Sequence, residues 1–142
     1  MPGLTDIAEN SYTDFVWRAQ VWIIGATLSF ELYTAAPGET GGGTVATYTG
    51  YASIGVARSL ANFAGTQAAG STVASSGTGG QTSNNAAITY GAPTSGPQTI
   101  VAVGVKDGAT LLTFGSLTTN RTLNAGDAAP SFAISAFTST ID

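Results

Sequence analysis

The sequence predicts a mainly β fold: an antiparallel β-sandwich, of the jelly-roll or immunoglobulin-like kind, with one short N-terminal helix. Many short runs of Val, Ile, Thr, Tyr and Phe are separated by glycine-rich turns. Asp107-Gly108 lies between two of these runs and is a strong hairpin signal, because both turn positions tolerate positive φ. A length of 142 residues fits one core of ordinary size, so we expect a single domain over residues 1–142.

The N-terminal segment predicts the helix. Asp6 followed three residues later by Glu9 resembles a capping box, and apolar residues recur at about helical spacing from Leu4 to Ala19. We therefore expect an amphipathic helical arm from about Asp6 to about Arg18. Two roles for it stay open: a lid over one open end of the sheet core, or an arm that docks on a neighbouring subunit.

Strand signals follow the helix. Residues 28–33 alternate apolar with polar, which is typical of a strand with one buried face, and Pro37-Gly38 with the glycines at 41–43 then turn the chain. Residues 44–60 predict one bent strand or two short ones broken near Gly50 or Gly55. Further strands are predicted at 86–90, 99–106, 110–117, 121–123 and 132–141, with a turn at 124–127.

The segment from about 64 to 85 differs from its neighbours. It consists of Gly, Ser, Thr, Ala, Gln and Asn around Val73, a composition typical of a flexible linker. A linker here would divide the chain into two fragments too small for good cores, so a long loop of one domain is the better interpretation. We expect a contact to hold this loop in place, and a neighbouring molecule is a reasonable candidate.

Composition excludes most catalytic chemistry. The chain has neither cysteine nor histidine, so thiolate nucleophiles, histidine bases and the common zinc sites are impossible. Asp107 and Asp127 form the best carboxylate pair for glycoside hydrolysis, but both stand in turn sequences where Asp is favoured for local reasons. No window supplies a calcium loop, and the glycine runs lack the Lys-Ser/Thr of a phosphate loop. We therefore expect no enzyme activity, no catalytic or metal-binding residues and no cofactor.

Charge and hydropathy limit the classes of partner that the chain could bind. The four basic residues are scattered and the net charge is -4, which argues against nucleic-acid binding. The apolar run Val21–Gly25 is too short to span a membrane and is a poor signal peptide, since it starts late and follows three acids. We expect a soluble protein that is made in the cytoplasm without secretion and binds no membrane.

Only 8% of the residues are charged, so the surface is poorly protected against association. We expect copies of the chain or other proteins to cover much of it, which favours a homo-oligomer. Aromatic residues supply the candidate interface positions, although core packing is the favoured interpretation of the two tryptophans in a chain with so few aromatic residues. These candidates are Phe15, Trp17, Trp22, Tyr48 and Tyr51.

Short blocks along the chain carry a resemblance to a known family. They are Leu32-Tyr33-Thr34-x-x-Pro37-Gly38, Gly50-Tyr51-Ala52, Ser83-Asn84-x-x-Ala87-Ile88-Thr89-Tyr90, Val103-Gly104-Val105-x-Asp107, Leu111-Leu112-x-Phe114-Gly115-x-Leu117, Thr122-Leu123-x-x-Gly126-Asp127 and Ile141-Asp142. Collinear over about residues 4 to 142, they resemble a family of small bacteriophage virion proteins usually labelled tail fibre or minor tail proteins. The resemblance implies a non-catalytic structural subunit.

The leading hypothesis is therefore a multi-copy tail-associated or fibre-associated subunit on the particle exterior, synthesised in the host cytoplasm and acting through symmetric contacts with itself and other virion proteins. One alternative is a capsid decoration, or cement, protein that bridges capsomers. Another is a host-glycan-binding module, which would need Tyr48, Tyr51 and Tyr90 exposed on one face.

Overall fold

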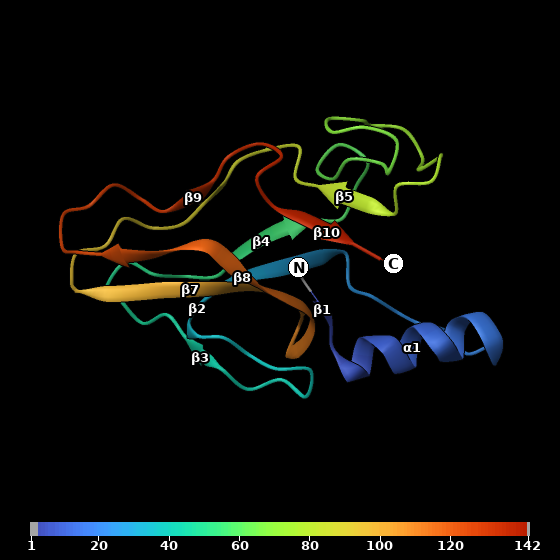
Figure 1. The fold of residues 1–142 in the computed structure, drawn as a ribbon, viewed down its shortest axis with the longest axis horizontal. Coiled ribbons are helices and arrows are strands. Elements are labelled where there is room, and N and C mark those ends of the chain that lie inside the picture. Colours follow the sequence, from blue (N-terminus) through green and yellow to red (C-terminus); the bar gives the residue numbers. More distant parts are fainter. Residues whose placement is uncertain (1–2, 142) are drawn as a thin grey trace.

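The centre of the fold is a six-stranded antiparallel sheet (Figure 1), in a computed structural model that describes residues 3–141. Along the sheet the order is β1 (Gly3–Leu4), β8 (Thr110–Leu123), β7 (Gln98–Asp107), β2 (Thr27–Ala35) and β3 (Thr44–Val45), and β4 (Ile54–Ala57) also pairs with β2. Two smaller sheets pair β10 (Thr138–Thr140) with β5 (Gln81–Ser83), and β6 (Ile88–Thr89) with β9 (Ser131–Phe132). With one short helix in the described residues, this architecture confirms the predicted mainly β, sandwich-like class.

The core forms where strand alternation places apolar side chains on one face of the large sheet. Phe30 of β2 pairs with Val105 of β7, and Leu32 pairs with Val103, so all four side chains point to the same side. Ile88 and Phe137, from the region of the small sheets, are buried in the same cluster. The Phe30 and Phe137 rings meet edge to face, with centroids 5.0 Å apart. The core therefore joins the large sheet to the segments that carry the small ones.

The predicted hairpin at Asp107-Gly108 is confirmed. β7 and β8 are antiparallel partners across this turn, and Gly108 has φ +56°, a value that L side chains rarely adopt. β8 differs from prediction, because it runs without a break where the sequence indicated two strands separated by residues 118–120. Its pairing with β7 shifts register there: Ser116 pairs with Ala102 and Arg121 with Ile100, so residues 117–120 form a bulge within one continuous strand.

Residues 44–60 contain two short strands, β3 and β4, with a break that includes Gly50, which is one of the two forms predicted for this stretch. The single strand predicted at 132–141 is wrong, because the structure has β9 and β10 with a turn between them. Only Ile88–Thr89 of the predicted strand 86–90 is paired. Apolar residues in these stretches are buried without extended pairing, as Ala46 and Tyr48 show at 2% and 4% exposure. In these stretches the runs of apolar residues predicted correctly which side chains are buried, but they did not predict how long the paired strands are.

The segment predicted as a loop from 64 to 85 is held by its own chain. Gln67 donates from its amide to Ser71 Oγ and accepts from the Ser76 N–H, while Thr66 Oγ1 donates to the Ser76 carbonyl. The end of the segment forms β5 and pairs with β10, in register from Gln81 to Ser83. These bonds hold the segment within its own chain, and a contact with a neighbouring molecule stays a prediction.

Candidate functional site: an exposed arm and an apolar pocket

The N-terminal helix α1 (Asp6–Trp17) begins at a residue that is fixed to the sheet. Thr5 is 1% exposed, and its Oγ1 donates to the Leu111 carbonyl at 2.6 Å and accepts from the Ala8 N–H at 3.4 Å. Its own N–H donates to the Leu112 carbonyl at 3.0 Å. Thr5 is thus the N-cap, one residue earlier than the capping box at Asp6 that the sequence predicted.

Beyond its first turn, α1 leaves the body of the protein, and Figure 1 shows its far end lying away from the large sheet. Ala8 is the helix's only buried residue. Phe15 and Trp17, near the far end, are 57% and 79% exposed. Apart from Ala8 in its first turn, the helix does not pack on the core in this structure, which gives the lid interpretation little support.

The residues that lead from α1 to β2 are extended and continue the exposed apolar surface. Val21 and Ile23 are 81% and 83% exposed. The segment is fixed again at its end, where Arg58 Nη1 donates to the carbonyls of Ile24 (2.7 Å) and Gly25 (3.0 Å), and the Gly25 N–H donates to the Asp107 carboxylate at 3.1 and 3.2 Å. We call residues 6–23 the arm; it is attached to the sheet at both ends and exposed between them.

The five interface candidates divide into two groups. Phe15, Trp17 and the half-buried Trp22 belong to the arm. Tyr48 is 4% exposed and lies in the core, and Tyr51 packs against that core from the side. Sequence analysis missed Val21 and Ile23, although their alternation with Trp22, in an apolar run too short to span a membrane, was the available indication.

Tyr48, Tyr51 and Tyr90 pack against one another inside the protein. Ring centroids lie 5.3 Å apart for Tyr48 and Tyr51, and 6.1 Å apart for Tyr51 and Tyr90. Tyr51 Oη accepts the Leu32 N–H at 2.9 Å, and burial raises the pKa of Tyr51 to about 12. Burial raises the pKa of Tyr90 as well, and Tyr90 is 3% exposed. The exposed tyrosine face that glycan binding required is therefore absent from this set.

The two candidate catalytic carboxylates lie at opposite ends of β8. Asp107 precedes the strand and accepts from the N–H of Gly25, whereas Asp127 follows it and accepts from the Asn124 N–H at 2.8 Å. β7, whose 10 residues join the same two ends, separates the turns by roughly 30 Å, while paired glycosidase carboxylates stand about 5–10 Å apart. Each carboxylate accepts a hydrogen bond from a backbone N–H, which is a structural role.

Among residues 3–141, no group of three or more acidic side chains is placed to hold a metal ion.

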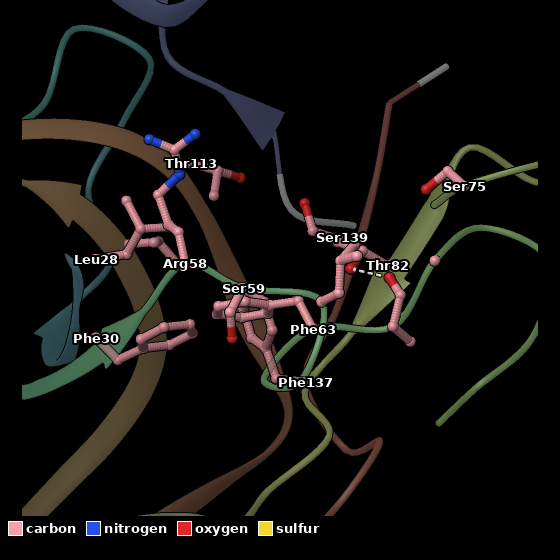
Figure 2. A pocket seen from close by; sticks show the side chains of 14 residues that line it. Leu28, Phe30, Arg58, Ser59, Phe63, Ser75, Thr82, Thr113, Phe137 and Ser139 are labelled. Atoms are coloured by element: carbon pink, nitrogen blue, oxygen red, sulfur yellow. Dashed lines mark hydrogen bonds between the residues drawn. The ribbon is translucent and has the colours of Figure 1, made fainter. Parts of the chain in front are cut away.

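An apolar pocket of about 520 Å³ opens beside the large sheet. Figure 2 shows Leu28 and Phe30 beside Phe63 and Phe137, and the Phe30 ring packs against both other rings, with centroids 6.2 Å and 5.0 Å away. Arg58 lies at the edge, and no acidic residue lines the opening. The pocket offers aromatic and aliphatic contact with a single cationic group beside it, which suits an apolar side chain with an acidic neighbour.

Within the described part of the chain, no helix has the length and apolar character needed to cross a membrane.

Comparison with known proteins supports the resemblance seen in the sequence. The family model for the podophage GP4 fiber I protein gp80 matches residues 3–140, nearly the whole chain. No curated protein matches the chain. A match of this extent covers the arm, the large sheet and the pocket together, and it confirms the expected phage tail fibre family. The chain therefore belongs to the family of the podophage GP4 fiber I protein gp80, a family of virion structural proteins.

Proposed function

We propose that this protein is a non-catalytic subunit present in several copies at the tail or its fibres, on the particle exterior, and that the arm joins it to neighbouring copies and to other virion proteins. The observation that carries the proposal is the exposed apolar surface of the arm. The large apolar side chains that it leaves open are Ile7, Tyr12, Phe15, Val16, Trp17, Val21 and Ile23.

The size of this surface matches that of a specific interface. A fully exposed aromatic side chain offers about 150–250 Å², and an aliphatic one somewhat less, so these partly exposed side chains present roughly 800 Å² together. A stable complex of standard size buries about 800 Å² on each partner. A monomer rarely leaves so much apolar side-chain surface open on one element, which supports docking through the arm.

The position of the arm supports docking on another molecule. Thr5 and Gly25 hold its two ends at the sheet, so the exposed side chains between them stay away from the core of their own chain. The rest of the surface carries few charges, and closing neighbours over it leaves few charges unpaired. Synthesis in the host cytoplasm, without secretion, is part of the same proposal.

A double variant, Phe15→Ser with Trp17→Ser, tests the arm. We expect the wild-type chain to form multimers in light-scattering chromatography and the variant to elute as the 14.1 kDa monomer with an unchanged circular dichroism spectrum. The matched control, Val73→Ser with Ile134→Ser, alters two similarly exposed residues outside the arm, at 62% and 61% exposure, and should assemble normally. Multimers of unchanged size in the arm variant would contradict assembly through the arm.

Copy number per particle tests the location. We expect quantitative peptide mass spectrometry of purified virions to give a small number set by the symmetry of the tail or its fibres. A ratio close to that of the major capsid protein would instead identify a capsid decoration protein, and absence from the particle would contradict both assignments.

A further inference from the structure

We propose that the arm of one copy docks into the apolar pocket of a second copy, with Trp17 against Phe63 and Leu60. This inference rests on the proposed function, which is assembly through the arm, and adds the surface that receives the arm. The pocket is built from β2, the chain that follows β4, and β10, all separate from the arm itself.

The pocket offers an indole ring the partly exposed Phe63 side chain. Phe30 and Phe137 lie beneath it at 0% and 7% exposure, and the Phe63 ring is stacked 6.2 Å from Phe30. Leu60, on the rim, is 54% exposed. A tryptophan ring inserted here would reach the centroid separations of about 4.5–7 Å at which aromatic pairs attract each other. Burying Trp17 and Leu60 together removes two of the large exposed apolar side chains from water.

The arm of the same chain does not fill the pocket in this structure. Thr5 fixes the start of α1 to β8, and the helix extends about 18 Å from there to Trp17, which is 79% exposed. Arg58, at the edge of the pocket, binds the carbonyls of Ile24 and Gly25 at the other end of the arm. With both ends of the arm held in this way, we assign the arm that fills the pocket to a second copy.

Charge complementarity favours the same pairing. The arm carries three acids, Asp6, Glu9 and Asp14, against one base, Arg18, which already pairs with Asp14 at 2.8 Å. The pocket lining contains Arg58 and no acid, and no carboxylate pairs with Arg58 among residues 3–141. An approaching arm therefore brings net negative charge to a positive rim, which speeds encounter and orients the helix.

Each copy offers one arm and one pocket. Two copies can exchange arms as a reciprocal pair, or several can close into a ring. The contact joins two different surfaces, so it predicts arm-to-pocket proximity and no arm-to-arm proximity.

Cysteine cross-linking tests this prediction directly, because the natural chain has no cysteine. Gln20→Cys places a thiol on the arm, and Ser59→Cys places one at the pocket. Mixing the two variants under oxidising conditions should give a covalent dimer that contains one of each. The matched control replaces Ser59→Cys with Val73→Cys, an exposed position outside the pocket, and should give little product.

The other outcomes separate the two proposals. If Gln20→Cys cross-links mainly to itself and gives no mixed dimer, the arms pack on each other; the pocket proposal is then overturned and assembly through the arm remains. If the mixture gives no cross-link while the wild-type chain forms multimers, the pocket is again excluded. If the wild-type chain is a monomer and no pair cross-links, both proposals fail.

A charge placed in the pocket gives an independent measurement. Leu60→Glu should weaken self-association at least tenfold, while Val73→Glu, equal in charge and similarly exposed, should leave it unchanged. Trp17 and Trp22 are the chain's only tryptophans and both belong to the arm, so a blue shift of tryptophan emission with concentration reports docking. Equal association of the two glutamate variants would overturn the proposal.

Discussion

At the scale of single residues, Asn84 holds the C-terminal segment to the rest of the fold. It is 1% exposed, and its side-chain amide donates to the carbonyls of Ala86 (2.7 Å) and Ala133 (2.8 Å). Its Oδ1 accepts the Phe137 N–H at 2.9 Å, which places the Phe137 ring in the core. One buried polar side chain therefore positions residues about 50 apart in the sequence.

We expect Asn84→Ala to lower the free energy of unfolding by about 3 kcal/mol, because it leaves a buried N–H and two carbonyls without partners at roughly 1 kcal/mol or more each. Urea denaturation followed by circular dichroism measures the change. Asn120→Ala, at an exposed position on β8, serves as the control and should alter stability by less than about 0.5 kcal/mol. A similar small effect at both positions would show that the Asn84 bonds contribute little.

At the scale of elements, β2 and β7 are joined on the face opposite the core as well. Glu31 accepts from Tyr33 Oη at 2.9 Å and pairs with Lys106 of β7 at 3.5 Å. The Tyr33 ring lies over Gly104 of β7, where an added Cβ would stand 2.9 Å from the ring and 2.8 Å from a methyl of Leu111. The absence of a side chain at Gly104 therefore makes room for Tyr33.

Gly104→Ala should destabilise the protein by about 1–3 kcal/mol, because the new methyl group displaces both the Tyr33 ring and the Leu111 side chain. Thermal unfolding measures this as a lowered midpoint. Gly3→Ala is the matched control, since a Cβ at Gly3 meets nothing within 4 Å. If the two variants unfold at the same temperature, the close packing over Gly104 does not contribute to stability.

At the scale of the whole molecule, buried tyrosines make stability sensitive to alkali. Burial raises the pKa of Tyr51 to about 12 and also raises the pKa values of Tyr33, Tyr48 and Tyr90 above the ordinary value of 10.0. Above about pH 10 the unfolded chain loses phenolic protons that the folded chain keeps, so unfolding becomes more favourable as pH rises.

We expect the free energy of unfolding to stay constant with respect to these groups up to about pH 9 and to fall steadily above about pH 10. Urea denaturation at a series of pH values measures it. Tyr51→Phe removes one of the groups, so its curve should fall less steeply than that of the wild-type chain. Parallel curves for the two proteins would contradict a contribution from Tyr51.

The single domain expected over residues 1–142 stays a prediction at this scale. One cluster of buried side chains draws on the large sheet and on the segments that carry the small ones, which supports a single cooperative unit.

Local patterns were enough to predict part of this protein. The alternation in residues 28–33, the Asp107-Gly108 turn and the helical spacing after Leu4 each depend on near neighbours, and β2, the hairpin and α1 all exist where these patterns placed them. The absence of cysteine and histidine likewise excludes, on composition alone, those mechanisms that need a thiolate or an imidazole.

Which aromatic residues are buried could be seen only in the three-dimensional structure. Tyr48, Tyr51 and Trp17 were all interface candidates from sequence. The two tyrosines pack with Tyr90 in or against the core, whereas Trp17 lies at the end of a helix that leads away from the sheet. β5 could not be predicted either, because its polar residues gain strand structure only by pairing with β10 more than 50 residues later. Short-range periodicity was therefore enough to predict the helix of the arm and the strands of the hairpin. The exposure of the arm and the shape of the pocket depend on long-range packing, which a local sequence pattern does not contain.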